Sequence, residues 1–493
     1  MSTMGKDASE RQAAELNMIP IRSGASISRR TLLGAMAGAG GYALLPRPLH
    51  AEMPGRPISL SAEPGAARFL PQGEPTRIWG YGGTVPGPEI RIRQGGEVFA
   101  RLSNGIGEPT TIHWHGVRID NAMDGVAHLT QPPVEPGQSF DYRFKAPDAG
   151  TFWYHPHAHQ VMQQDRGLYG LLIVEEPKPV AVDRDVSLII DDWRLNADGS
   201  IETQSLAHLF DAAHAGRIGN LLTANGQVAP TLPARSGERL RVRLCSACNS
   251  RILELQFENA RAQVIAVDGQ PISPELMDGG ASFVLPPSGR ADVVLDLTGE
   301  PGSQVSVREV TREPISIARF VLADDVRARE RPLDTPVTLP RNPVPVPNLS
   351  QDPLVFPLLM EGGAMSSMAG AEYEGKYFSL RDLAQKHRMV WAFNGKAGNH
   401  ISPLFTVERG RPVVIKMTNA TAWPHAMHIH GHHMLTISRT RGTLKPWFRD
   451  TVLMQPREEM SVAFLADNPG KWMLHCHMLE HQMAGMSAYF EVI

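Results

Sequence analysis

The sequence has few of the residues that characterise several common protein classes. Only three of its 493 residues are cysteine, too few for a framework of disulfide bonds. Lysine and arginine (48) nearly balance aspartate and glutamate (51), so the net charge of −3 gives no indication of a surface that binds nucleic acid. Hydrophobic residues still make up 42% of the chain, which is enough for a large buried core. These counts exclude a disulfide-rich scaffold, a disordered chain and a multi-span membrane protein.

The first 51 residues indicate an export signal rather than a folded segment. Arg29 and Arg30 precede an uncharged run from Thr31 to Pro46, and Ala51 is a small residue of the kind that a signal peptidase accepts. The run is too short and too weakly apolar for a transmembrane helix, which needs ~20 apolar residues, so we expect no stable membrane insertion. Residues 1–51 resemble a twin-arginine signal peptide, which exports folded proteins and implies a periplasmic location. The alternative is a chance pair of arginines in a disordered tail.

Turn-forming residues and short β-branched or aromatic runs predict an all-β protein. The chain has 45 glycines and 40 prolines, and they separate runs such as Thr151–Tyr154 and Leu171–Val174. This spacing is typical of β-sandwiches and barrels. Breaks near Glu176–Pro179 and in the proline-rich stretch Arg331–Pro353 divide the mature chain. We therefore predict three β domains, at residues 52–178, 179–330 and 331–493.

Histidines are concentrated in four short windows of the sequence. Ten of the 19 histidines lie in residues 113–115, 155–157, 425–430 and 475–481, where random placement would put fewer than one. No histidine lies between His214 and His387, so we expect the middle domain to carry no metal. Such clusters of imidazoles predict metal sites in the first and third domains.

The spacing of these histidines suits β-strands. On a strand, residues i and i+2 face one side and residue i+1 faces the other. In His475-Cys476-His477 the two histidines would face one way and the thiolate the other, so one strand could touch two metal centres joined by a peptide. A single His-x-His pair is more simply explained as a structural or surface pair. Four such clusters in one chain make that explanation unsatisfactory.

The cysteine in the last cluster predicts a particular metal. A thiolate with two imidazoles and a weak, distant thioether is the ligand set of blue copper. His481 and Met486 follow Cys476 by five and ten residues, and a chain that turns back could bring both to the sulfur, with His425 completing the set. Zinc also binds Cys and His, but zinc needs no connection to eight further imidazoles. Copper therefore explains more of the pattern.

Together these motifs resemble the three-domain bacterial multicopper oxidases, of the laccase-like or cuprous oxidase-like kind. The resemblance spans the mature chain and rests on His113-Trp114-His115-Gly116, Trp153-Tyr154-His155-Pro156-His157, His425-Ala426-Met427-His428-Ile429-His430-Gly431-His432, and His475-Cys476-His477-Met478-Leu479-Glu480-His481 followed by Met486. It implies three cupredoxin-like Greek-key β-sandwich or barrel domains. It also implies an enzyme that oxidises a small reductant (a phenol, an aromatic amine or Cu(I)) in one-electron steps at a blue copper and reduces O2 to water at a cluster of three coppers.

The resemblance further implies four copper ions, with their ligands distributed over the four clusters. Cys476 would also carry electrons towards His475 and His477. The ligands would be His425, Cys476, His481 and Met486 for the type 1 copper, His113 and His428 for the type 2 copper, His115, His155 and His477 for one type 3 copper, and His157, His430 and His475 for the other.

Two acidic residues are candidates for supporting roles. Asp124 occupies the position of the family's cluster carboxylate, which supplies protons; the alternative is a turn residue in Asp124-Gly125, and both roles are compatible. Asp450 resembles a carboxylate that orients a blue-site histidine, and its alternative is a surface salt bridge with Arg449. Gln482 stands where many bacterial relatives carry a second carboxylate, which weakens the expectation of a second acid relay.

The reductant is less clearly indicated. Thirteen of the 21 methionines lie in residues 353–493, where uniform composition predicts about six. Thioethers select Cu(I), so Met360, Met365 and Met368 are candidates for receiving cuprous ions. Methionine also fills gaps in cores, and oxidation of phenols is nearly as well supported; a ferroxidase is a further alternative.

Other functions and residues have simpler explanations. A copper-free envelope scaffold would have lost the ligands, and a two-domain nitrite reductase would be shorter and would lack the four clusters. Cys245 and Cys248 are expected to be small buried residues, with a periplasmic disulfide as the second choice.

Overall fold

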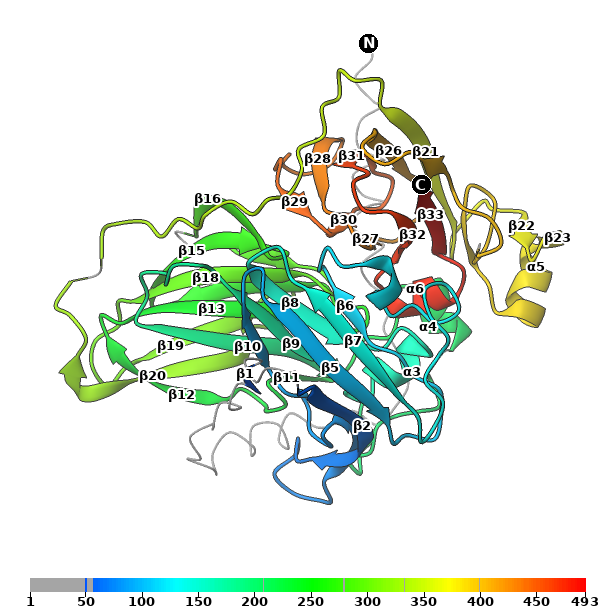
Figure 1. Cartoon of the computed structure of the whole chain (residues 1–493). Coiled ribbons are helices and arrows are strands. Elements are labelled where there is room, and N and C mark those ends of the chain that lie inside the picture. Colours follow the sequence, from blue (N-terminus) through cyan, green and yellow to red (C-terminus); the bar gives the residue numbers. More distant parts are fainter. Residues whose placement is uncertain (1–48, 51–55, 207, 278–279, 332, 399) are drawn as a thin grey trace, which may run out of the picture.

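The computed structural model describes residues 49–50, 56–206, 208–277, 280–331, 333–398 and 400–493. The predicted signal peptide, residues 1–51, lies outside the described residues apart from the short strand β1 (Leu49–His50). Within these ranges, no helix is long and apolar enough to cross a membrane. The chain consists of β-sheets joined by loops and a few short helices, which confirms the all-β prediction (Figure 1).

Residues 49–50 and 56–175 form two sheets, with strand orders β1-β4-β9-β8-β6 and β3-β2-β5-β7. Strand β5 alternates exposed and buried residues because only one of its faces lies on the core. The elements of this section are β2 (Ile58–Ala67), β3 (Thr76–Tyr81), β4 (Ile90–Arg93), β5 (Glu97–Asn104), β6 (His113–His115), η1 (Asn121–Met123), β7 (Ser139–Lys145), β8 (Gly150–His155), α3 (Gln160–Gln164) and β9 (Gly170–Glu175).

Residues 184–327 also form two sheets, with strand orders β11-β10-β13-β18-β15-β16 and β12-β20-β19-β14-β17. Strands β13 and β18 are buried along their whole length, because the rest of the molecule covers the outer face of their sheet. The elements are β10 (Arg184–Trp193), α4 (Leu209–Ala213), β11 (Leu221–Ala224), β12 (Thr231–Ser236), β13 (Arg239–Ser246), β14 (Leu253–Glu258), β15 (Ala260–Val267), β16 (Gln270–Met277), β17 (Phe283–Leu285), β18 (Arg290–Leu297), β19 (Gln304–Glu309) and β20 (Ile315–Arg327).

Residues 354–492 form two large sheets, β24-β21-β26-β31-β28-β29 and β25-β33-β32-β27-β30, and the hairpin β22-β23. The elements are β21 (Leu354–Gly362), β22 (Gly370–Tyr373), β23 (Lys376–Ser379), α5 (Leu380–Asp382), η2 (Leu383–His387), β24 (Trp391–Phe393), β25 (Thr406–Val407), β26 (Pro412–Asn419), β27 (His425–Ile429), β28 (Met434–Arg439), β29 (Phe448–Arg449), β30 (Thr451–Met454), β31 (Glu459–Leu465), β32 (Gly470–Cys476), α6 (Leu479–Met483) and β33 (Ser487–Val492).

One pattern of strand pairing occurs three times along the chain. In each section the opening long strand pairs antiparallel with one neighbour and parallel with the other, as β2 does with β3 and β5, β10 with β11 and β13, and β21 with β24 and β26. The parallel neighbour then pairs antiparallel with β7, β18 or β31, respectively. The three sections therefore share one β-sandwich topology.

The apolar core brings the first and third sections together. One continuous cluster of buried residues contains Trp114 and Tyr154 of the first section with Trp391, Met427 and Cys476 of the third. The middle section has a separate core of its own. Figure 1 shows the consequence: β6 and β8 are directed towards β27 and β32, so the histidine motifs at both ends of the chain meet.

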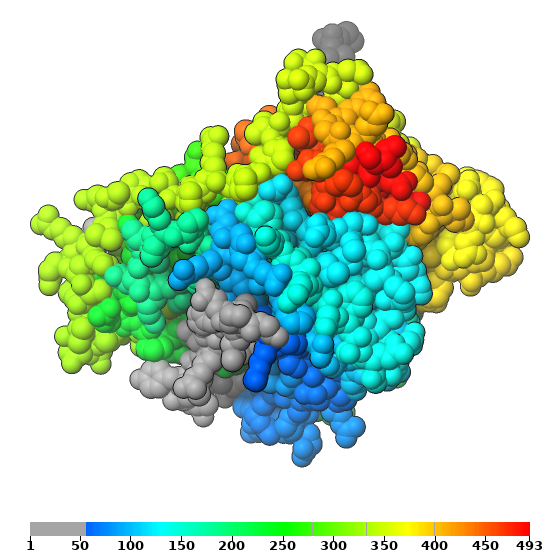
Figure 2. Space-filling model, in the orientation of Figure 1, coloured from blue at the N-terminus to red at the C-terminus, as the bar shows by residue number. Residues whose placement is uncertain are grey.

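The proline-rich stretch forms an extended connection, as predicted. Residues 333–353 contain no helix or strand, and in the space-filling view this part of the chain crosses the surface between the middle and third sections (Figure 2). Arg239 donates to the carbonyl of Thr335, and the Asn342 amide donates to the carbonyl of Ala149. These hydrogen bonds hold the connection against the middle and first sections.

Candidate metal centre

Four strands position most of the predicted ligands. β6 pairs antiparallel with β8, which sets His113 opposite His155. β27 pairs antiparallel with β32, which sets His428 opposite His475. The ends of these two strand pairs face each other, so residues more than 300 positions apart in the chain share one buried space.

Eight imidazoles surround this space, and we refer to them as the histidine cluster. They form three groups of three, and His115 belongs to two of these groups. In each group the ligand atoms lie within 4.8 Å of one another. All eight are buried, His157 being the most exposed at 7%. The groups are His115, His155 and His477; His157, His430 and His475; and His113, His428 and His115.

Short contacts between ring nitrogens indicate that these groups suit metal ions. Nε2 of His430 lies 3.1 Å from Nε2 of His475, and Nε2 of His155 lies 3.4 Å from Nδ1 of His115. Burial lowers the pKa of imidazoles such as His155 and His475 well below its usual value, so they are neutral and have a lone pair to offer. Buried nitrogens without any hydrogen-bond partner occur at His113, His157, His428 and His477. Unpaired buried nitrogens of this kind fit a metal cluster better than a hydrogen-bonded core.

A second group, the cysteine site, surrounds the sulfur of Cys476. Nδ1 of His425 lies 3.7 Å and Nδ1 of His481 lies 3.8 Å from Sγ, and the two nitrogens are 3.1 Å apart. Burial raises the pKa of the Cys476 thiol to about 12, so a bound cation must displace the proton. Met486 is fully buried, and its backbone carbonyl accepts a hydrogen bond from the amide of Cys476. The loop after β32 therefore turns back to the cysteine as the spacing predicts.

The two groups are joined by one strand end. His475 belongs to one triad of the histidine cluster and His477 to another, while Cys476 between them belongs to the cysteine site. Each flanking histidine is one peptide bond from the cysteine. A thiolate with two imidazoles suits copper, and the neutral imidazoles of the cluster also suit it.

A segment from the middle section covers the cysteine site, and we refer to residues 208–214 as the α4 cover. Nε2 of His481 lies 2.8 Å from the backbone carbonyl oxygen of His214, and the Trp391 indole donates to the carbonyl of Ala212. Phe210, which is 60% exposed, stacks on His214 with ring centres 4.2 Å apart. Sequence reasoning missed this cover, because His214 is isolated and no local pattern relates it to α6.

Asp124 lies at the histidine cluster. Its carboxylate oxygens lie 2.9 Å from Nδ1 of His430 and 3.3 Å from Nδ1 of His113, and its backbone carbonyl lies 2.8 Å from the same His113 nitrogen. A side chain at Gly125, which has a φ of +78°, would collide with the carbonyl oxygen of Ile112. Asp124 therefore has both expected roles, as a turn residue before Gly125 and as a carboxylate in contact with the histidine cluster.

The expectation for Asp450 was wrong in both of its forms. The residue is fully buried rather than at the surface, and its carboxylate pairs with both terminal nitrogens of Arg290. It lies 3.1 Å from Nε2 of His115 and 3.5 Å from Nδ1 of His428, which belong to the histidine cluster and not to the cysteine site. Although burial alone would raise the pKa of the Asp450 carboxyl, Arg290 holds it well below its usual value. Asp450 directly precedes β30, at the end of that strand that lies opposite His428. His425 lies opposite Met454 at the other end of β30, so the carboxylate is near the histidine cluster and not near the blue-site histidine.

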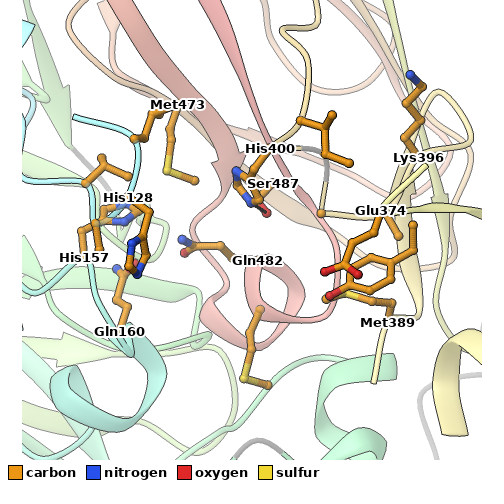
Figure 3. A pocket seen from close by; sticks show the side chains of 18 of the residues that line it. His128, His157, Gln160, Glu374, Met389, Lys396, His400, Met473, Gln482 and Ser487 are labelled. Carbon is orange, nitrogen blue, oxygen red and sulfur yellow. Dashed lines mark hydrogen bonds between the residues drawn. The ribbon is translucent and has the colours of Figure 1, made fainter. Parts of the chain in front are cut away.

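A cavity of about 670 Å³ ends at the histidine cluster (Figure 3). Its lining includes His157, Gln160 and Gln482, together with His128, His159 and four methionines. Gln482, which replaces the expected carboxylate, directs its amide into this cavity (Figure 3). The cavity was not foreseen, because its lining comes from segments far apart in the sequence.

The remaining candidates lie apart from the cluster. Met360 is fully buried in the core, Met368 is 8% exposed and Met365 is 59% exposed. Cys245 and Cys248 are buried and free, in line with the first expectation for them.

Known proteins resemble this chain over most of its length. Sequence models of the multicopper oxidase family match residues 65–179 and 376–493. The curated relative Multicopper oxidase MmcO from Mycobacterium tuberculosis is 28% identical over 89% of this chain and 88% of its own.

Solved structures extend the similarity to three dimensions. A multi-copper oxidase from Pseudomonas thermotolerans is 32% identical with a TM-score of 0.78, covering 91% of this chain and 100% of that one. Lac15 from a marine microbial metagenome is 35% identical with a TM-score of 0.70, covering 89% of this chain and 100% of its own. These similarities confirm the predicted cupredoxin-like fold.

Proposed function

Because this chain belongs to the multicopper oxidase family, a class of oxidoreductases that use O2, we propose that it couples the one-electron oxidation of a small donor at the cysteine site to the reduction of O2 to water at the histidine cluster. The observation that carries the proposal is the position of Cys476. Its sulfur lies within 3.8 Å of two imidazole nitrogens, while its two sequence neighbours belong to the histidine cluster.

We propose four copper ions with the ligands inferred from the sequence. His425, Cys476, His481 and Met486 would hold one ion. His113 and His428 would hold a second, and the triads His115–His155–His477 and His157–His430–His475 would hold the other two. When bound, the coppers supply the one-electron oxidation of four donor equivalents and the reduction of one O2, with four protons, to two waters.

The chain's own residues would perform three further tasks. Asp124 fixes the rings of His430 and His113 and is the carboxylate nearest to them for handling protons. Asp450, neutralised by Arg290, fixes His115 and His428. The cavity that ends at His157 offers a path for O2 and water.

We propose aromatic donors, phenols or aromatic amines, as the first class of reductant. The α4 cover presents the exposed ring of Phe210 stacked on the partly buried His214, and the Trp423 ring lies 5.2 Å from His214. Planar electron-rich rings stack well on such a surface.

Cu(I) is the second candidate, supported by Met365. This exposed thioether follows Ala364, whose amide donates to the carbonyl of Ala213 in the α4 cover. Oxygen uptake with a phenol, Cu(I) and Fe(II) as separate donors would rank these classes and test the ferroxidase alternative.

The experiment for the function uses the full chain loaded with copper. We expect an intense blue colour in air, four coppers per chain, and oxygen consumption with at least one of the three donors. A Cys476→Ser variant should lose the colour and the oxygen uptake. A colourless, copper-loaded wild type in its oxidised state would contradict the proposal, and a wild type that binds no copper would favour the copper-free scaffold.

We also propose export to the periplasm by the twin-arginine route. The support is the Arg29-Arg30 pair followed by an uncharged run, which lies outside the described residues. An Arg29→Lys/Arg30→Lys variant should stay in the cytoplasm on cell fractionation. Periplasmic recovery of this variant would contradict the proposal.

A further inference from the structure

The cavity at the histidine cluster is lined by buried and by exposed histidines. His157, where the cavity meets the cluster, is 7% exposed, and its Nε2 has no hydrogen-bond partner. His128 and His159 also line the cavity, and both are exposed to solvent. Figure 3 shows His128 beside His157, with Met473 directed towards both. Of the eight cluster histidines, His157 is the one that lines this cavity.

Four thioethers also line this cavity. They belong to Met162, Met389, Met473 and Met483, and three of them lie in the methionine-rich part of the sequence, residues 353–493. Met473 is buried, whereas the other three are partly exposed. Thioethers are soft ligands that prefer Cu(I) to harder ions.

The two exposed histidines are held in an unusual backbone conformation. The φ angles are +65° at His128 and +49° at His159, a region that non-glycine residues occupy at a cost of about 1–3 kcal/mol. Neither imidazole forms a hydrogen bond or an ion pair within the described part of the chain. Both side chains are therefore available to an ion that enters from solvent.

A copper ion that reaches the buried histidine cluster needs ligands along its path to replace the water that it loses. All eight cluster histidines are buried, and moving a bare cation from water into such an interior is strongly unfavourable. Successive weak thioether and imidazole ligands would replace the lost water, and the cluster, with two or three imidazoles per ion, would bind more tightly than any of them.

We propose that this cavity binds Cu(I) through its methionines and histidines and delivers it to the histidine cluster at His157. The inference rests on the proposed function, because it assumes that the cluster holds copper. The competing explanation is that the methionines only fill an irregular cavity, in which case leucine would serve equally well.

The test follows copper uptake by the metal-free full chain. Wild type and a Met162→Leu/Met389→Leu/Met483→Leu variant receive chelator-buffered Cu(I) without oxygen, and protein-bound copper is counted in samples quenched over time. Exposure of each sample to air then reports the cysteine site separately by its blue colour. The control variant, Met277→Leu/Met417→Leu/Met460→Leu, changes three methionines that do not line the cavity. Leucine and methionine have similar volumes, so all variants should fold.

We expect the cavity variant to fill the cysteine site at the wild-type rate and the remaining sites about tenfold more slowly. Equal uptake by the cavity variant and wild type would overturn the inference, and so would equal slowing in the control variant. A wild type that never binds more than one copper would instead contradict the proposed function.

Discussion

Nε2 of His481 lies 2.8 Å from the backbone carbonyl oxygen of His214, 267 residues earlier in the chain. The ring is fully buried, and its other nitrogen faces the sulfur of Cys476. A donor therefore cannot touch this imidazole directly. It must approach across the α4 cover, where Phe210 is exposed and stacks on the partly buried His214.

Replacing Phe210 by alanine should weaken aromatic donors specifically. The substitution removes a stacking surface worth about 0.5–1.5 kcal/mol, so we expect KM for a phenol to rise by about two- to tenfold. The value of kcat and the blue colour should stay unchanged, because Phe210 contacts no proposed ligand. Steady-state oxygen uptake measures both constants.

Tyr377→Ala provides the matched control for Phe210. Tyr377 is also an exposed aromatic residue, at 69%, but it lies on the β22–β23 hairpin. A similar rise of KM in both variants, or none in either, would count against donor docking on the α4 cover.

Asp124→Asn should slow the reduction of O2 while leaving the cysteine site intact. The amide keeps the shape of the side chain near His430 and His113 but cannot accept and release a proton. We expect kcat to fall by about 10²-fold or more, with an unchanged blue colour. A fall of oxygen uptake with unchanged reduction of the blue colour by donor under anaerobic conditions would confirm that the defect is at the cluster. Full activity of the variant would remove Asp124 from the mechanism.

Arg290→Met should destabilise the protein and its cluster together. The substitution leaves the Asp450 carboxylate buried without its cation, and loss of one partner of a buried pair costs about 3–5 kcal/mol. Because the folded-state pKa of Asp450 is depressed, the pair stabilises fully above the unfolded pKa of ~3.9 and is lost only in stronger acid. Thermal unfolding and copper content at pH 7 therefore measure the whole effect.

A double variant separates charge from packing at this pair. Arg290→Met/Asp450→Asn removes both charges, so it should recover part of the lost stability. If the double variant were as unstable as the sum of the two single variants, the charge pair would not be the cause.

The thiols of Cys245 and Cys248 should resist alkylation in the folded protein. Burial raises the pKa of both thiols, so at pH 8 they are protonated, and the thiolate is the reactive form. The reactive fraction grows as pH rises, but only far above pH 8 for these two residues. Mass spectrometry after labelling should find neither modified in the native state and both modified after denaturation. A disulfide between them would leave both unlabelled under denaturing, non-reducing conditions.

The convergence of the histidines with Cys476 was predictable because its signals are local, whereas the assignment of ligands to individual coppers came from the family resemblance. Alternation along a strand places His475 and His477 on one side and Cys476 on the other, whatever the rest of the fold does. Short runs between glycines and prolines likewise predicted the β-sheets. The same reasoning brought His481 and Met486 back to the cysteine, since the intervening loop is short.

The supporting residues were not predictable in this way. Arg290 reaches Asp450 across 160 positions, and neither residue carries a motif for the other. The cavity at His157 depends on how α3, α6 and the segment around Met389 pack together. Such contacts are fixed by tertiary packing and leave no periodic trace in the sequence.

The bond between Arg290 and Asp450 also limits how far the molecule can be simplified. Joining the first and third sections directly, to make a smaller enzyme, would remove the Arg290 guanidinium. The negative charge of Asp450 would then lie unpaired beside His115. Any such redesign must therefore neutralise position 450 as well. Although the middle section has a separate core, its Arg290 supplies the positive charge that neutralises Asp450 in the third section.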